Sequence, residues 1–183
     1  GTPAKHMEVK IKSDDPENVL GEIWTRGLNV MQGYYKNEEA TRQVLDEEGW
    51  YHTGDLATMS RDGHVFIRGR IKNMLLGANG QNVYPEEIED KLNSMAMVSE
   101  SLVLQRGDEL VALVYPDMEE AGQMGFSEED LVNVMIQNRL ELNQILPSFC
   151  KIAEIQLHGE EFAKTPKKSI KRYLYQNVVK NEK

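Results

Sequence analysis

The sequence predicts an α+β protein in two parts. Before about residue 70, apolar and charged residues alternate in short segments, which is the period of half-buried β-strands. After about residue 70, residues that begin helices stand between strand-like runs. The chain has 183 residues, 40% of them hydrophobic and 28% charged, which is enough for a core of ordinary size. We therefore expect a β-rich piece followed by a small α+β domain with a short sheet flanked by helices.

Alternation and turn residues place four strands and one helix in the first part. Pro16 and its polar neighbours supply a turn between the first two strands, and Arg-Asp-Gly at residues 61–63 is a hairpin signal. Asn37 caps a short helix whose first turn carries two glutamates. The strands are expected at residues 7–12, 21–26, 50–59 and 64–68, with a turn at Gly54-Asp55 within the third, and the helix at 38–45.

Helix-starting residues organise the second part. Pro85, followed by two glutamates, is typical of a first helical position, and Ser127 begins a capping box. A tight turn joins two strands in the middle of this part and makes them antiparallel neighbours. The helices are expected at 85–94, 127–145 and 169–179, and the strands at 74–76, 101–105, 110–115 and 152–157.

A domain boundary is expected near Arg70 to Lys72, where the pattern changes. The domains are then 1–70 and 71–183. The first has only about 70 residues and no evident second sheet to pack on, so its own core would be small. We therefore expect it to be the end of a larger domain whose start lies upstream.

Charge and composition exclude some partners and places. The net charge of −9 argues against nucleic acid as the main partner, because phosphate neutralisation needs clustered Lys and Arg. No apolar run approaches the ~18 residues of a membrane span, and a secretory signal is absent from the first residues, so we expect a cytoplasmic protein. The single cysteine, Cys150, reads as a packed thiol without a disulfide partner. The oligomeric state is not predicted.

Asp55, Arg70 and Lys72 are the polar candidates in the first part. Asp55 follows a strand-like run and is placed to accept hydrogen bonds from vicinal hydroxyls such as those of a ribose, although an ordinary turn aspartate looks the same. The guanidinium of Arg70 suits phosphate or sugar oxygens, and Lys72 stands at the predicted joint between domains. Taken singly, either cation is also consistent with a solvated surface charge.

Two segments of the second part are candidates for binding an anion. The glycine-rich loop at 77–82 would let the backbone approach a ligand, but it matches neither a Walker loop nor GxGxxG. The alternative is that it only connects two elements and binds nothing. Residues 164–183 contain seven Lys or Arg and one Glu, and the segment 164–172 is a basic loop before a predicted helix. The four histidines have no ligand spacing, so no metal site is predicted.

Four motifs resemble one enzyme superfamily in their order and spacing: GWYHTGDL, GHVFIRGRIKN, GANGQNVYPEEIE and KTPKKSIKRYLY. The superfamily is that of the adenylate-forming, or AMP-binding, enzymes: acyl-CoA synthetases, peptide-synthetase adenylation domains and luciferases. The resemblance covers essentially the whole chain. The segments RGLNVMQGYY, GQNVYP and LVALVYPD look most like long-chain fatty acid CoA ligases. The resemblance implies that 1–70 is the barrel-like end of a large nucleotide-binding domain and 71–183 a mobile C-terminal domain.

The resemblance also implies roles for single residues. Asp55 matches an aspartate that binds the ribose hydroxyls, Arg70 an arginine that contacts ribose and phosphate, and Ile67 a residue that lines the nucleotide site. Lys72 matches the hinge about which the C-terminal domain rotates between two half-reactions. Gly80 matches a glycine whose loop lines the channel for the pantetheine arm of CoA. The implied cofactors are ATP or AMP, CoA and magnesium, with the magnesium ligands upstream of this chain.

The basic tail departs from the family pattern Gly-Lys-Ile-x-Arg, whose lysine stabilises the charge that develops during adenylation. Aligning Ile170 and Arg172 puts Lys168 at the glycine and Ser169 at the lysine. Lys168 is our candidate for the catalytic lysine, because a long side chain can absorb a shift of one residue. Lys171 is the second candidate.

These features predict the C-terminal fragment of an ATP-dependent fatty acyl-CoA synthetase that is inactive by itself. Its substrate would be a fatty acid or another carboxylic acid. One alternative is an adenylation domain that loads a carrier protein instead of CoA. Another is a non-catalytic interaction module whose basic tail docks on an acidic surface, which leaves peripheral membrane contact open.

Overall fold

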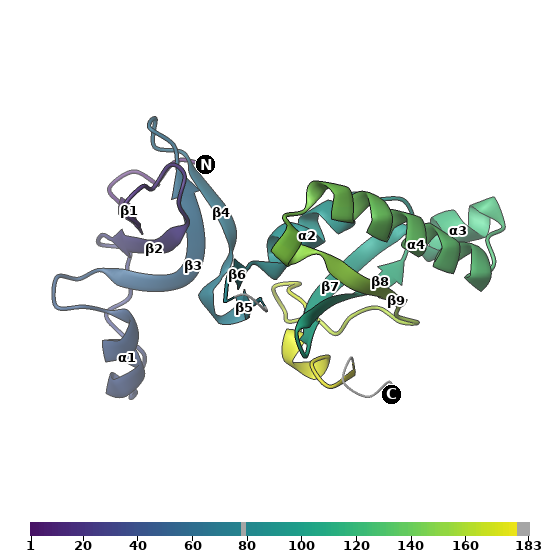
Figure 1. The fold of residues 1–183 in the computed structure, drawn as a ribbon. Coiled ribbons are helices and arrows are strands. Elements are labelled where there is room, and N and C mark those ends of the chain that lie inside the picture. Colours follow the sequence, from purple (N-terminus) through teal and green to yellow (C-terminus); the bar gives the residue numbers. More distant parts are fainter. Residues whose placement is uncertain (78–79, 179–183) are drawn as a thin grey trace. The chain divides into compact units, whose positions relative to one another are not determined.

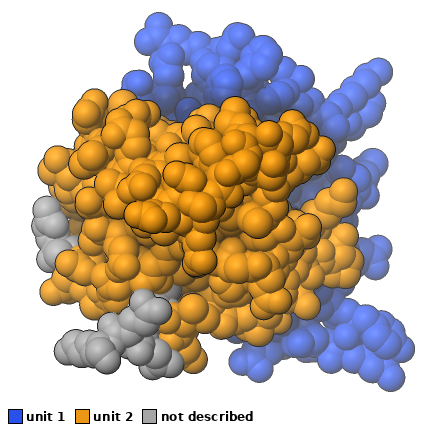
Figure 2. All heavy atoms as spheres, turned by 90° about the vertical axis from the view of Figure 1, so that its right-hand side faces the viewer, with its two compact units in different colours: residues 1–73 blue, residues 74–183 orange. Residues whose placement is uncertain are grey.

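The computed structural model describes residues 1–77 and 80–178, and within them the protein is a mixed α+β fold (Figure 1). This confirms the predicted class. The chain forms two compact units, Gly1–Asn73 and Met74–Lys183, which Figure 2 shows in different colours. Each unit has its own sheet and its own hydrophobic core.

The first unit is an open antiparallel sheet in the order β1-β2-β3-β4. Its core is small and centres on Ile11, Ile23 and Ala57. Helix α1 begins at Asn37, whose side chain accepts a hydrogen bond from the third residue of the helix. The elements are β1 (Glu8–Lys12), β2 (Gly21–Arg26), α1 (Glu38–Val44), β3 (Tyr51–Met59) and β4 (Val65–Arg70), all close to their predicted positions.

Strand β3 differs from the prediction at Gly54 and Asp55. The expected turn is wrong, because β3 runs through both residues without a break. They lie instead in a bulge, where three residues of β3 stand opposite Ile23 of β2. Gly54 has a φ of 71°, a left-handed conformation that glycine adopts at little cost. A bulge redirects the side chains that follow it, so this irregularity decides where Asp55 points.

The second unit is built on a three-stranded sheet in the order β7-β8-β9. The first two strands form the predicted antiparallel hairpin, and β9 lies parallel to β8. Helices α2 and α4 lie on the same side of this sheet (Figure 1). The elements are β5 (Leu75–Leu76), β6 (Asn82–Val83), α2 (Pro85–Leu92), β7 (Val98–Arg106), β8 (Glu109–Pro116), α3 (Met118–Met124), α4 (Glu128–Ile145) and β9 (Ile152–Leu157).

Both faces of this sheet are buried, because alternate residues of β7 and β8 enter different cores. Helices α2 and α4 cover the larger core, which includes Ile88, Leu92, Val103, Ala112, Val114, Leu131, Met135, Leu142 and Ile152. The neighbouring strand residues enter a smaller core with the tail of the chain, which includes Leu102, Leu104, Val111, Leu113, Phe162 and Tyr175. The tail is therefore packed on the sheet face opposite the helices.

The helices of the second unit begin at residues that are typical of helix starts. Pro85 stands at the start of α2, as expected. Ser127 and Asp130 form the predicted capping box of α4, since each side chain accepts a hydrogen bond from the backbone of the other. Helix α3 was not predicted, although Asp117 caps its first turn and Gly125 ends it with a φ of 69°.

The predicted final helix is wrong for the part of the tail that the structure describes. There the chain forms only a 3₁₀ turn, Arg172–Leu174, and residues after 178 lie outside the described ranges. Tyr173 and Leu174 stand at helical spacing from Ile170, and both are exposed. Tyr175 is buried instead, and its hydroxyl accepts a hydrogen bond from the Ala163 N–H at 2.7 Å. The contacts of one aromatic side chain thus prevail over helical periodicity.

Candidate functional site

Asp55 and Arg70 lie side by side on β3 and β4. Their Cα atoms are direct partners in the antiparallel register, and Arg70 Nε lies 2.7 Å from Asp55 Oδ1. The side chain of Asp55 is 27% exposed and that of Arg70 is 51% exposed. The 2.7 Å contact joins one nitrogen of a guanidinium that has three to one oxygen of the carboxylate. The pair therefore combines a donor fork and an acceptor at a surface that solvent can reach.

The bulge in β3 fixes the backbone on which Asp55 stands. The Asp55 N–H donates to the Thr53 hydroxyl at 3.0 Å, and that hydroxyl donates to the Ile23 carbonyl at 2.9 Å. The Gly54 N–H donates to Glu22 Oε1 at 2.9 Å. Side chains thus replace the ladder hydrogen bonds that the bulge interrupts. The sequence reading missed Glu22, which looks like any solvent-facing residue of an alternating strand.

A second irregularity brings Ile67 to the same side of the sheet as Arg70. Asp55 pairs with Arg70 and Ala57 pairs with Ile67, so Arg68 is an extra residue in β4. Cross-strand partners share a face, and residues 55 and 57 of β3 share a face as well. Ile67 is 68% exposed. The structure therefore places an apolar side chain on the face that carries the ion pair.

Lys72 lies directly after this sheet. It is the central residue of a 3₁₀ turn, η1 (Ile71–Asn73), which ends the first unit, and its side chain is exposed. The second unit begins one residue after η1. Lys72 therefore stands at the connection between the two compact units.

Gly80 lies in the loop between β5 and β6. Its φ is 74°, and its N–H donates to the Gly77 carbonyl at 2.8 Å. A side chain at this position would be strained by the left-handed backbone and not by its surroundings, since no atom lies within 4 Å of an added Cβ. Residues 78 and 79 of the predicted glycine-rich loop lie outside the described residues.

Lys168 lies at the tip of a short hairpin formed by residues 164–170, which we name the basic hairpin. The Thr165 N–H donates to the Ser169 carbonyl and the Lys168 N–H to the Thr165 carbonyl, both at 2.8 Å. The φ of Lys168 is 63°, a value that glycine favours. The expectation of a basic loop at the start of an α-helix is therefore replaced by a tight turn with lysines at its tip.

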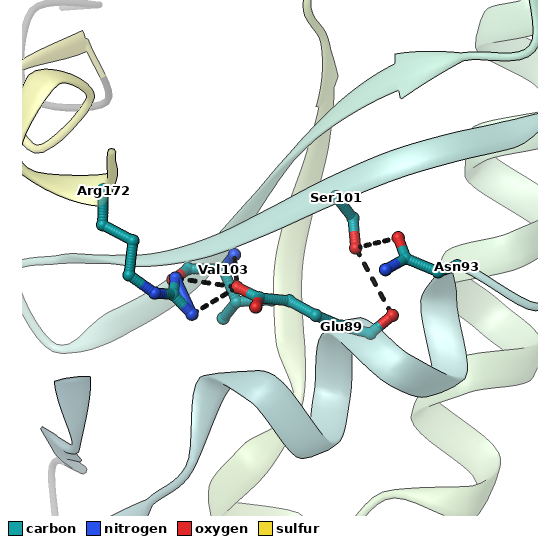
Figure 3. A network of polar contacts seen from close by, with 5 residues as sticks. All are labelled: Glu89, Asn93, Ser101, Val103 and Arg172. Atoms are coloured by element: carbon teal, nitrogen blue, oxygen red, sulfur yellow. Dashed lines mark hydrogen bonds and ion pairs between the residues drawn. The ribbon is translucent and has the colours of Figure 1, made fainter. Parts of the chain in front are cut away.

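The basic residues of the tail fall into two kinds. Lys164 and Arg172 are tied to the body of the unit. Lys164 pairs with Glu100 at 2.5 Å. Figure 3 shows the second contact, in which Arg172 pairs with Glu89 at 2.6 Å. The second kind makes no ion pair within the described residues; it comprises the exposed Lys167 and Lys168 and the half-buried Lys171. These lysines are free to meet a ligand.

Glu89 is a functional candidate that the sequence reading missed. It is 9% exposed, and burial raises its pKa to about 7, against the opposing pull of the Arg172 guanidinium. A signal was present, because Glu89 stands four residues after Pro85 and three before Leu92, on the apolar face of α2. Cys150, by contrast, is the buried thiol that was expected, and burial raises its pKa as well.

Residues 1–77 and 80–178 contain no group of three or more His, Cys, Asp or Glu residues arranged to hold a metal ion. Within the same ranges, no helix combines the length and the apolar character that crossing a bilayer requires.

Known proteins resemble this chain in sequence and in fold. The sequence model of the family described as "AMP-binding enzyme C-terminal domain" matches residues 72–182. Long chain acyl-CoA synthetase 7, peroxisomal, from Arabidopsis thaliana is 35% identical over 180 residues, which is 90% of this chain and 25% of that protein. The 2-succinylbenzoate–CoA ligase of Bacillus cytotoxicus is 36% identical over 141 residues, which is 73% of this chain and 28% of that protein.

The fold is also that of solved structures. An ATP-bound RpMatB-BxBclM chimera superposes with a TM-score of 0.80 at 24% identity, and the match covers 98% of this chain and 36% of the chimera. This identity supports likeness of fold alone. The chain thus spans about a quarter of the length of the two relatives and about a third of the solved structure.

Proposed function

Because the chain belongs to the AMP-binding enzymes, with their C-terminal domain at residues 72–182, we propose that it is the C-terminal part of an ATP-dependent acyl-CoA synthetase. Such an enzyme joins a carboxylate to the α-phosphate of ATP and releases pyrophosphate. It then transfers the acyl group from the adenylate to the thiol of CoA and releases AMP. The observation that carries the proposal is the partly exposed Asp55–Arg70 pair beside Ile67.

The chemistry of this pair suits the sugar and phosphate of an adenylate. We assign Asp55 to the ribose, because a carboxylate accepts hydrogen bonds from two neighbouring hydroxyls. Arg70 would donate to ribose and phosphate oxygens through its guanidinium nitrogens other than Nε, which contacts Asp55. Ile67 would pack against the nucleotide. ATP in such reactions carries magnesium, which withdraws charge from the phosphates; its ligands are proposed to lie in the upstream part of the enzyme.

The second unit would supply the groups that change between the two half-reactions. We propose 1–70 and 71–183 as the two domains and Lys72 as the pivot, because it stands in the short turn between the compact units. A change of a few backbone dihedrals there is sufficient for a hinge. Gly80 would line the path of the pantetheine arm, where a glycine lets a ligand approach the backbone.

A long-chain fatty acid is the proposed acyl substrate. The Arabidopsis thaliana relative, named a long chain acyl-CoA synthetase, matches 90% of this chain. The Bacillus cytotoxicus relative is named for a different acid, 2-succinylbenzoate. The acyl group is tested by comparing kcat/KM for fatty acids and for aromatic acids in the full-length enzyme.

Lys168 is the proposed catalytic lysine. Its left-handed backbone supports its alignment with the glycine of the family pattern, which leaves Ser169 at the lysine position. A neighbouring lysine must then supply the charge. In the full-length enzyme, Lys168→Ala should slow adenylate formation by about 10²-fold, as removal of a preorganised charge stabiliser does. Thioester formation from supplied acyl-adenylate should survive.

Matched variants separate Lys168 from its neighbours. Lys167→Ala removes an equally exposed charge from the same turn and should change adenylate formation less than threefold, roughly 0.7 kcal/mol. Lys171→Ala tests the second candidate. Equal losses of both half-reactions in Lys168→Ala would remove the assigned role. The 183 residues alone should be inactive, and acyl-CoA formation by them from fatty acid, ATP and CoA would overturn the view that they are only a part.

A further inference from the structure

The carboxylate of Glu89 is held by three donors in the interior of the second unit (Figure 3). Its Oε1 accepts from Arg172 Nη1 at 2.8 Å, from Arg172 Nη2 at 2.6 Å and from the Val103 N–H at 2.6 Å. The side chains of Glu89 and Arg172 are 12% and 16% exposed. They join helix α2 to a residue 83 positions later in the chain.

Stability alone does not account for this pair. Two buried charges lose their hydration, and apolar side chains of similar volume in the same place are often equally stabilising. An ion pair adds direction, because the guanidinium is planar and donates along fixed lines. Arg172 Nη1 also lies 3.3 Å from the Val103 carbonyl, which accepts from it. The N–H and the carbonyl of one β7 residue are therefore both engaged, and the guanidinium has one orientation.

Backbone hydrogen bonds connect Arg172 to the basic hairpin, so the orientation of Arg172 affects the position of the hairpin. The Arg172 N–H donates to the Ile170 carbonyl at 3.0 Å, and the Lys171 N–H donates to the Ala163 carbonyl at 2.9 Å. The residues between the hairpin and Arg172 are thus hydrogen-bonded to the base of the hairpin. A rotation of Arg172 would therefore move the whole turn.

The other strand of the basic hairpin has a weaker anchor on the same β-strand. Lys164 Nζ lies 2.5 Å from Glu100 Oε1, and Glu100 belongs to β7, as Val103 does. Their side chains are 29% and 25% exposed, so solvent screens this pair more than the pair at Glu89. The direction of the hairpin depends mainly on the buried anchor.

We propose that Glu89 is a positioning residue: by holding Arg172 against β7, it fixes the direction in which the basic hairpin presents Lys168 to an anionic phosphate. The proposal rests on the proposed function, which supplies the phosphate. Glu89 touches neither nucleotide nor acyl group in this role. Its loss should therefore lower the rate of adenylate formation and leave the KM for ATP within threefold.

The first test measures the hairpin itself and needs no activity. In the full-length enzyme, native-state trypsin cleavage after Lys167 and Lys168 should accelerate by about tenfold in Arg172→Lys, which keeps the charge and loses the planar fork. Cleavage after Arg139, in the middle of α4, should stay within twofold of the wild type. The matched control is Arg106→Ala, which breaks another 2.7 Å ion pair of the same sheet, with Glu154, and should change neither rate.

The second test measures the reaction. Glu89→Gln, which keeps one acceptor oxygen, and Arg172→Lys should each slow adenylate formation by about 10²-fold, the size of effect that a misplaced catalytic group produces. The double variant Glu89→Leu with Arg172→Met replaces the pair by apolar side chains and guards against misfolding. It should keep the wild-type melting temperature within about 4 °C and still lose the rate.

The outcomes separate this proposal from the function on which it rests. A wild-type enzyme that forms no acyl-adenylate overturns the proposed function. An active wild type whose Glu89→Gln and Arg172→Lys variants keep their adenylation rates overturns the positioning role, as does equal acceleration of cleavage at Lys168 and Arg139. Faster hairpin cleavage, a slower adenylation rate and an unchanged KM for ATP support it.

Discussion

Each unit contains one arginine–carboxylate pair to which we assign a role, and the two pairs differ in their access to solvent. Arg70 and Asp55 meet at 2.7 Å on an open sheet, with the arginine side chain half exposed. Arg172 and Glu89 meet at 2.6 Å in the interior, where the Val103 N–H is a third donor to the same carboxylate oxygen. The contact distances are nearly equal, so distance does not distinguish the pairs.

The pairs differ in how easily water or a ligand can replace one of the two partners. At an exposed site the free energy of an ion pair is small, because water competes for both partners. A ligand can therefore replace or extend such a pair at little cost. In a buried pair each partner is needed to compensate the lost hydration of the other. The first arrangement suits binding, and the second suits the fixing of a segment.

The largest expected effect separates the pairs by stability. At pH 8, Arg172→Ala should lower the free energy of unfolding of the second unit by about 3–5 kcal/mol, because it leaves Glu89 buried without its cation. Arg70→Ala should cost less than about 1 kcal/mol. Urea denaturation followed by hydrogen exchange in each unit measures both values. Equal losses of unfolding free energy in Arg172→Ala and Arg70→Ala would contradict the proposed difference between the pairs.

Glu89 should also give the second unit a pH dependence. Its pKa is raised from 4.5 to about 7 by burial first, with Glu86 and Asp90 adding to the rise and Arg172 and the Val103 N–H opposing it. The folded state therefore binds this proton more tightly than the unfolded state. The resulting stabilisation is complete below pH 4.5 and is lost as the pH rises through 7, a fall of roughly 3 kcal/mol.

Glu89→Gln should remove that slope, since an amide does not titrate. Urea denaturation at pH values from 4.5 to 8 compares the variant with the wild type. A wild-type slope that persists in Glu89→Gln would assign the pH dependence to another group.

The next effect concerns binding and belongs to the exposed pair. In the full-length enzyme, Asp55→Ala should weaken AMP binding by about 10- to 100-fold, the value of one or two hydrogen bonds to a charged group. The free energy of unfolding should change by less than about 1 kcal/mol. Isothermal titration calorimetry measures the affinity. Asp62→Ala, at an exposed aspartate of the β3–β4 turn, is the control and should bind AMP as the wild type does.

The smallest expected effect is an increase in the free energy of unfolding. Lys168→Gly should raise the free energy of unfolding by about 1 kcal/mol, because a lysine in the left-handed region is strained and a glycine is not. Lys167→Gly, in the same turn but without a positive φ, should lower it by about 0.5–1 kcal/mol. Thermal or urea denaturation measures both. A loss in both variants would show that strain at Lys168 is negligible.

Local signals in the sequence predicted most of the fold. Alternation located β1 and β2, and capping residues located α1, α2 and α4, because these elements depend on their own residues and on one buried face. The similarity to AMP-binding enzymes, read from four motifs, is confirmed by the family match at residues 72–182. The roles of Asp55, Arg70, Ile67, Lys72, Gly80 and Lys168 remain predictions.

The errors occurred where contacts distant in sequence decide the structure. The turn predicted at Gly54-Asp55 is a bulge, because Glu22 and Thr53 supply the hydrogen bonds that let β3 continue. The predicted tail helix is absent from residues 169–178, because Tyr175 packs on the sheet. Glu89 escaped notice because its partner stands 83 residues away. Local periodicity carries no information about such partners.

The distance along the chain between Glu89 and Arg172 has a consequence for synthesis on the ribosome. Translation delivers α2 and β7 before Arg172, which stands 83 positions after Glu89, so the domain spends part of its synthesis with the Glu89 carboxyl lacking its cation. In that interval burial favours the protonated carboxyl, and the Arg172 guanidinium lowers the pKa of Glu89 once the ion pair forms.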